Sequence, residues 1–149
     1  MTAMTRRFAL AIGAAAVATP ALAGKDAVFT NWLGYAIRGY DPVAYHKEGR
    51  PVEGSSDFTH DWQGATWSFA SADNRDLFAA DPEAYAPQFG GYCAWAVSQG
   101  YTAPVDPNAW DIIDGKLYLN YNTDIQSRWR KDIPGHIASA TANWPGILN

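Results

Sequence analysis

The sequence predicts an α+β fold, a single small domain with short antiparallel hairpins and several short helices. Alternating apolar and polar residues at 58–69 surround Gln63-Gly64, and those at 110–119 surround Asp114-Gly115, so both stretches predict hairpins with two-residue turns. Ser or Asp stands before several short helix-forming runs, in places with Pro at the first helical position, which predicts capped helices. Residues 24–149 have the length of one domain with its own hydrophobic core.

The first 23 residues have the pattern of an export signal. Arg6 and Arg7 precede an apolar, alanine-rich stretch, and Ala21-Leu22-Ala23 has the small-x-small pattern of a cleavage site. The paired arginines favour the twin-arginine route. The apolar stretch is too short to span a bilayer, and no later segment approaches about 18 uninterrupted apolar residues. We therefore expect an export signal at 1–23, a mature periplasmic domain at 24–149, and no transmembrane segment in that domain.

Composition argues against two classes of function. The chain carries 11 Lys and Arg against 15 Asp and Glu, and loss of Arg6 and Arg7 would make the mature part more acidic still, which argues against nucleic-acid binding. Both methionines, Met1 and Met4, lie in the predicted signal, so a methionine-rich copper site is excluded from the mature domain. With one cysteine there is no internal disulfide, and the many Trp, Tyr and Phe residues are expected to stabilise the fold by packing.

The first half of the domain contains a short helix, a loop and a hairpin. Asp41-Pro42 predicts the helix start, with Asp41 as the N-cap, and Gly49 ends the helix. Residues 25–35 are expected to dock on the core as a partly irregular segment, and 48–57 to form a surface loop. The two-residue turn of the hairpin places six side chains on one face, in the facing pairs Trp62 and Ala65, His60 and Trp67, and Phe58 and Phe69. The polar face then carries Thr59, Asp61, Thr66 and Ser68.

The second half is richer in helix signals. Helix starts are predicted at Ser71, at Asp81-Pro82, at about residue 123 and after Pro134. The run 92–98 fits either a helix that ends near Gly100 or a buried strand.

Cys93 is the one cysteine of the chain, and it follows Gly90-Gly91 within an aromatic run. A single thiol is inert packing, a metal ligand, a nucleophile or half of an intermolecular bridge. If 92–98 is helical, Cys93 lies in the first turn, where backbone N–H groups and the helix dipole favour a thiolate. Cys93 is therefore the main candidate for chemistry.

Several motifs together resemble a known family. They are Gly39-Tyr40-Asp41-Pro42-Val43-Ala44-Tyr45, the tryptophan-rich hairpin, Pro87-Gln88-Phe89-Gly90-Gly91-Tyr92-Cys93-Ala94 and Asp114-Gly115-Lys116-Leu117-Tyr118-Leu119-Asn120. Over about residues 36–121, the chain is similar to the YHS domain family, in particular to its exported single-domain bacterial branch.

The resemblance departs from the family pattern at the metal-binding cysteines. Family members that bind metal read Asp-Pro-Val-Cys and later Phe-Cys-Ser-x-x-Cys. This chain keeps the spacing, but Ala44, Ala70 and Asn74 stand where those cysteines would be. A thiolate cluster needs its sulfurs to hold a soft metal ion, so the usual family site is absent.

The histidines supply the candidate partners of Cys93. His60, on the aromatic face of the hairpin, is the natural second metal ligand, and its ordinary alternative is a core histidine satisfied by one hydrogen bond. His46 is a weaker candidate, since its charged neighbours favour a solvent-facing position. His136, far along the chain, is expected at the surface.

Three functions follow from these residues. The leading hypothesis is a periplasmic protein that binds or passes on copper, as Cu(I), or zinc through Cys93 and His60, with His46 as the weaker ligand. The alternative is a metal-free interaction or binding module that kept the family frame and receives a periplasmic protein partner on its aromatic surface. The third is a redox or nucleophilic enzyme in which His60 is the base for Cys93. No third orienting residue is identifiable in the sequence, so we lean against catalysis.

Overall fold

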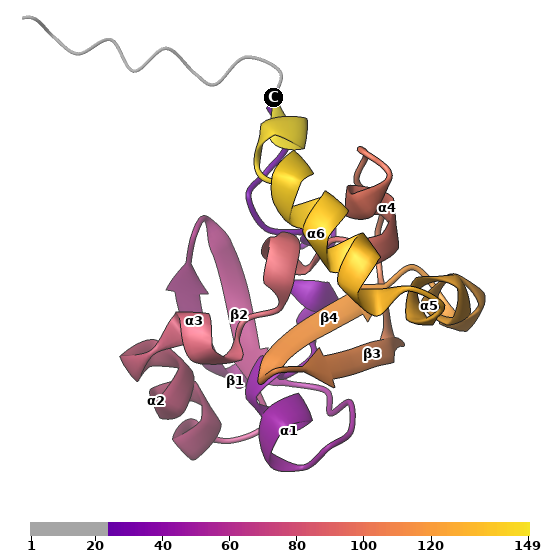
Figure 1. The fold of residues 1–149 in the computed structure, drawn as a ribbon. Helices are drawn as coiled ribbons and strands as arrows, with labels where there is room; N and C mark the ends of the chain where they lie inside the picture. Colours follow the sequence, from indigo (N-terminus) through magenta and orange to yellow (C-terminus); the bar gives the residue numbers. More distant parts are fainter. Residues whose placement is uncertain (1–23) are drawn as a thin grey trace, which may run out of the picture.

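The computed structural model describes residues 24–149, and the predicted export signal lies outside these residues. The described chain combines short helices with two small antiparallel sheets (Figure 1), which confirms the predicted α+β class. None of its helices has the length and apolar character needed to cross a membrane. In chain order, the elements are η1 Ile37–Gly39, α1 Pro42–Lys47, β1 Ser55–Trp62, β2 Ala65–Phe69, α2 Ala72–Ala80, α3 Pro82–Tyr85, η2 Gln88–Gly91, α4 Ala94–Ser98, β3 Asp106–Ile113, β4 Lys116–Asn120, α5 Thr123–Arg130, α6 Ile133–Asn143 and η3 Gly146–Leu148.

Both predicted hairpins form. β1 pairs with β2, and β3 pairs with β4, each as a separate two-stranded sheet. At the turns, Gln63 and Asp114 have φ angles of 50° and 52°, and each precedes a glycine that also has a positive φ. Two successive residues with positive φ are what the common two-residue hairpin turn requires.

The open end of the first hairpin departs from the predicted register. Near the turn the facing pairs are as predicted, but Phe69 pairs with Ser55 instead of Phe58. The cause is a bulge between Ser55 and Thr59, which adds residues to β1 without partners in β2. The predicted pairing of Phe58 with Phe69 is therefore wrong.

Ser68 also departs from its predicted place on the polar face. It is buried, and its hydroxyl donates a hydrogen bond of 2.8 Å to the carbonyl oxygen of Gly39. Gly54 covers this face so closely that a Cβ there would lie 2.5 Å from the Ser68 hydroxyl oxygen. Backbone at Gly39 and Gly54 thus covers the second face of the hairpin at Ser68. The alternation of apolar and polar residues does not predict this cover.

Side-chain caps begin most of the predicted helices. Ser71 accepts a hydrogen bond from the N–H of Asn74 at 3.1 Å, which starts α2. Asp132 accepts one from Gly135 in α6 in the same way. Asp81 precedes α3, but its side chain makes no capping hydrogen bond. The ambiguous run at 92–98 is helical, as α4.

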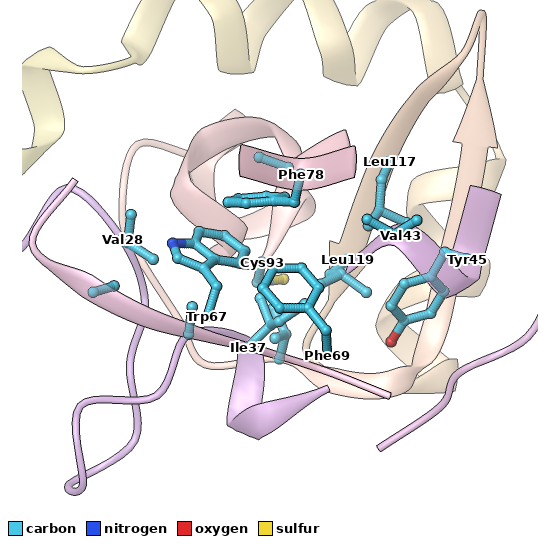
Figure 2. Close-up of a cluster of buried hydrophobic side chains, with 14 of the residues drawn as sticks. Val28, Ile37, Val43, Tyr45, Trp67, Phe69, Phe78, Cys93, Leu117 and Leu119 are labelled. Atoms are coloured by element: carbon cyan, nitrogen blue, oxygen red, sulfur yellow. The ribbon is translucent and has the colours of Figure 1, made fainter. Parts of the chain in front are cut away.

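The hydrophobic core has two parts that meet along β4. In Figure 1, α2 and α3 lie beside the β1–β2 hairpin, whereas α4, α5 and α6 lie on the opposite side of the domain. The first part is centred on Trp67, Phe69 and Phe78, and it includes Cys93 (Figure 2). The second part surrounds Trp129, whose ring lies 5.3 Å from that of Tyr118. Aromatic side chains thus lie at the centre of both parts, in keeping with the aromatic-rich composition.

The N-terminal segment docks on the domain as expected. The Lys25 N–H donates a 2.7 Å hydrogen bond to the carbonyl oxygen of Leu148, so the two ends of residues 24–149 lie together. Val28 is buried in the core. Beyond it, a turn leaves Trp32 91% exposed and Leu33 60% exposed.

Candidate functional site

A buried carboxylate occupies the region where the resemblance places the cysteines of metal-binding relatives. Asp41 is 0% exposed. Its Oδ1 accepts hydrogen bonds from the N–H groups of Val43 at 2.8 Å and Ala44 at 3.2 Å. Its Oδ2 accepts from the N–H of Ala70 at 2.9 Å and from the side-chain amide of Asn74 at 2.8 Å. Asp41 therefore joins the start of α1 to the end of β2 and to α2.

The side-chain amide of Asn74 makes hydrogen bonds through both its nitrogen and its oxygen. Its Nδ2 donates to Asp41, and its Oδ1 accepts a 3.2 Å hydrogen bond from the ammonium group of Lys47. Ala44 and Ala70 contribute only backbone N–H groups to the same carboxylate. These positions hold no sulfur or imidazole, and the four N–H donors occupy both oxygens of Asp41. The residues present therefore do not fit a soft metal ion.

Cys93 lies in a second buried polar arrangement, immediately before α4. The residue is 1% exposed, and its sulfur accepts a 3.2 Å hydrogen bond from the N–H of Tyr121. The sulfur also lies 3.5 Å from Oδ1 of Asn120. This amide oxygen accepts a 3.0 Å hydrogen bond from the N–H of Trp95, which fixes the oxygen toward the sulfur. The thiol must then supply the proton between sulfur and oxygen, and this favours its neutral form.

The prediction that the helix start favours a thiolate is wrong. Burial raises the pKa of the Cys93 thiol, although nearby backbone N–H groups, including those of Tyr121 and Trp95, partly oppose the increase. α4 has only five residues, and Cys93 is its N-cap rather than part of its first turn. Desolvation therefore outweighs the short helix, and the structure disfavours the charged nucleophile.

We expect Cys93 in the folded protein to react slowly with iodoacetamide at pH 7, and to gain reactivity only above about pH 9, because its pKa lies above the ordinary value of 9.0. The rate should be measured by mass spectrometry between pH 6 and pH 11, with the protein unfolded in guanidinium as the control. The same shift contributes stability that is present below the unfolded pKa and lost as the pH rises through the folded pKa. A rate that already levels off near pH 7 would instead support the nucleophilic hypothesis.

Cys93 also lines a pocket with almost entirely apolar walls. The pocket has a volume of about 330 Å³ and is lined by Cys93, Trp95, Ala96, Tyr101, Ala103, Tyr121 and Ile125. Tyr101 is 47% exposed and Tyr121 is 51% exposed, so aromatic rings extend from the buried sulfur to the surface. The rings of Trp95 and Tyr101 meet edge to face, with centroids 6.3 Å apart. The arrangement offers a small, partly open site for an apolar group.

Comparison with known proteins identifies one part of the chain. Residues 43–89 match the family model of the YHS domain. This part of the chain belongs to the YHS domain family. No curated protein and no solved structure shows a significant match to it. The matched region includes Ala44, Ala70 and Asn74 but ends before Cys93.

The three histidines of the chain occupy different environments. His60 is half-buried on β1, and its ring meets the edge of Phe78 with centroids 6.0 Å apart. His46 is half-buried on α1, with its Nε2 3.2 Å from the carbonyl oxygen of Tyr85, so its predicted solvent-facing position is wrong. Burial also lowers the pKa of His46, which favours the neutral ring. His136 is half-buried in α6, 3.3 Å from the Ser98 hydroxyl, because α6 packs against α4.

Hydrogen bonding does not join these histidines to Cys93. Within residues 24–149, the partners of its sulfur are Tyr121 and Asn120, whereas the contact of His60 described above is with Phe78. Nor do three or more His, Cys, Asp or Glu side chains gather in this range in a way that could hold a metal ion. Ligation by Cys93 and His60 stays a prediction.

Sequence reasoning missed two partners of the Cys93 thiol, Asn120 and Tyr121. Both follow the buried apolar residues of β4 directly, and Asn120 is itself fully buried. A polar residue at the end of an apolar strand can indicate a buried polar contact. The sequence does not reveal the partner of Asn120, however, because Cys93 lies 27 residues away. Asp41 was predicted only as a helix cap, and its bonds to Ala70 and Asn74 also depend on distant parts of the chain.

Proposed function

We propose that this YHS domain is a metal-independent binding module that takes a small apolar ligand in the pocket beside Cys93. The observation that carries the proposal is the pocket of about 330 Å³ with its apolar and aromatic lining. This volume lies at the lower end of the range of small-molecule sites, which are mostly apolar. An aromatic ring is the expected ligand group, because Trp95, Tyr101 and Tyr121 line the pocket and aromatic rings pack favourably on one another.

The two buried polar arrangements support a role without metal. At the family's cysteine positions, four N–H donors already satisfy the Asp41 carboxylate, so the backbone there is held together without an ion. At Cys93, the neighbouring amide oxygen and the burial both favour a protonated thiol, which is a poor metal ligand. A protonated thiol is instead a suitable wall for an apolar site. The predicted export signal supports a periplasmic location for this binding.

Indole is the probe that tests this proposal. We expect indole to bind the purified protein weakly, with a Kd on the order of 0.1–1 mM, as a ligand of this size allows. Binding should be measured by NMR, through chemical-shift changes and nuclear Overhauser contacts to Ala103 and Ile125. Ala103→Phe fills the pocket from its wall and should weaken binding at least tenfold. Ala80→Phe adds the same ring at an exposed position on α2 and should leave binding unchanged.

A titration with Cu(I) against a competing chelator compares this proposal with the soft-metal hypothesis. We expect Cys93→Ala and His60→Ala to retain no less copper than the unaltered protein. Tight one-to-one binding of Cu(I) that is lost in both variants would overturn metal independence and support a copper-handling role. Absence of indole binding at 10 mM would overturn the apolar ligand.

A further inference from the structure

We propose that a second cleft, on the other side of Tyr121, binds a small zwitterion of the amino-acid class that has an aromatic or apolar body. The cleft has a volume of about 620 Å³, which lies well within the range of small-ligand sites. It lies between the N-terminal segment around Trp32, the start of β3 at Asp106 and the residues that follow β4. This inference does not depend on the pocket beside Cys93, with which the cleft shares only Tyr121.

Two opposite charges line this cleft without pairing with each other. Arg38 is exposed, and its guanidinium makes no ion pair within residues 24–149. Asp106 is half-buried, and its Oδ1 accepts hydrogen bonds from the backbone and side-chain amides of Asn108. The cleft therefore offers a donor for a carboxylate and an acceptor for an ammonium group in one hollow.

The charges around Arg38 favour a zwitterion over a simple anion. Glu53 and Asp106 both line an adjoining hollow together with Arg38. A ligand that carries only a negative charge would meet these two carboxylates as well as the guanidinium. A ligand that also carries an ammonium group turns Asp106, the carboxylate that lines this cleft, into a partner, so its charges match those of the cleft.

The remaining walls suit an apolar body. Phe29, Trp32, Val105 and Tyr121 line the cleft, and Trp32 is the most exposed of them, at 91%. Trp and Tyr are enriched where proteins bind partners and ligands, because their rings offer a large apolar surface together with a polar group. The rings of Trp32 and Tyr121 can stack on an aromatic ligand or receive an ammonium group over their faces.

The backbone at Arg38 is held in an unfavourable conformation. Ile37 and Arg38 have φ angles of 43° and 59°, in the left-handed region that β-branched and long side chains rarely adopt. Ile37 is buried, and its N–H donates a 3.2 Å hydrogen bond to the carbonyl oxygen of Phe29. Packing therefore keeps Arg38 at this place in the cleft despite the strain, as is common at binding sites.

Three matched probes test the zwitterion: L-phenylalanine, 3-phenylpropionate, which lacks the ammonium group, and phenethylamine, which lacks the carboxylate. We expect calorimetry or NMR to show that L-phenylalanine binds the purified protein about tenfold more tightly than either of the others. Arg38→Gln should remove its advantage over phenethylamine. Asp106→Asn should remove its advantage over 3-phenylpropionate. Arg50→Gln, at an arginine paired with Glu48, is the matched control and should change nothing.

The variant Ala103→Phe, which fills the pocket beside Cys93, tests the zwitterion cleft separately from the proposed function. Ala103→Phe should leave the binding of L-phenylalanine unchanged, because Ala103 does not line the Arg38 cleft. Equal binding of the three probes, no binding of any probe, or unchanged preferences in Arg38→Gln and Asp106→Asn would overturn the zwitterion cleft. Loss of L-phenylalanine binding in Ala103→Phe would also overturn it and would place that ligand beside Cys93.

Discussion

Replacement of Asp41 by Ala is expected to lower the free energy of unfolding by about 3–5 kcal/mol, a large part of the stability of a domain of this size. Asp41 is fully buried, and its carboxylate accepts four hydrogen bonds from three parts of the chain. Alanine would leave buried donors without acceptors, each of which costs free energy. Asp41→Asn keeps the shape but places an amide where at least one N–H donor points, so we expect a loss of about 2 kcal/mol.

The chain provides a matched control for this prediction. Asp81 also precedes a proline at a helix start, but its side chain is exposed and makes no capping hydrogen bond. Asp81→Ala should therefore change the free energy of unfolding by less than about 0.5 kcal/mol. Urea unfolding followed by tryptophan fluorescence would measure both variants. Equal effects at Asp41 and Asp81 would show that the four hydrogen bonds of the Asp41 carboxylate contribute no measurable stability.

The Asp41 network explains how the YHS frame can exist without its cysteines. In this chain, α1, β2 and α2 are joined by one carboxylate and the amide of Asn74. Hydrogen bonds to a charged acceptor are among the stronger ones in proteins, and burial makes them costly to break. The region where the resemblance expects a metal centre therefore has a polar replacement rather than a vacancy. Disruption of the Asp41 network should therefore lower the stability of the fold rather than remove a ligand-binding site.

Local signals predicted most of the secondary structure. The turns at Gln63-Gly64 and Asp114-Gly115 and the caps at Ser71 and Asp41 each act within a few residues, so the sequence displays them directly. The aromatic composition likewise predicted the nature of the core. These features require no knowledge of which distant segments meet.

Most of the features that sequence reasoning missed depend on distant contacts. Ser68 is buried because the backbone at Gly39 and Gly54 packs over this face of the hairpin. The alternation of apolar and polar residues along a strand does not show which other segments cover it. His46 faces Tyr85, which lies 39 residues away. The thiol of Cys93 is neutral because of burial and Asn120, whereas the local sequence points only to a helix start. The sequence was therefore enough to select Cys93 as a candidate, but not to predict its burial or the residues that surround it.

Phe78 is the second position at which a large effect is expected, because it is the centre of the larger aromatic cluster. It is 0% exposed, and its ring lies 5.1 Å from those of both Trp67 and Phe69. The rings of Trp62 and His60 meet it edge to face, at 5.7 Å and 6.0 Å. Phe78→Ala would leave a cavity among these rings and should lower the free energy of unfolding by about 3–5 kcal/mol.

The neighbouring residue on α2 makes this prediction specific. Leu77 is 38% exposed, so Leu77→Ala should cost less than about 1 kcal/mol although it removes a large apolar side chain from the same helix. Phe78→Leu keeps most of the volume and should cost less than Phe78→Ala, which gives a measurable variant if the alanine variant does not fold. Thermal unfolding should show a fall in Tm of roughly 10–20 °C for Phe78→Ala. Similar shifts for Leu77→Ala and Phe78→Ala would mean that the buried ring of Phe78 stabilises the fold no more than an exposed side chain of the same helix, and would contradict its place at the centre of the aromatic cluster.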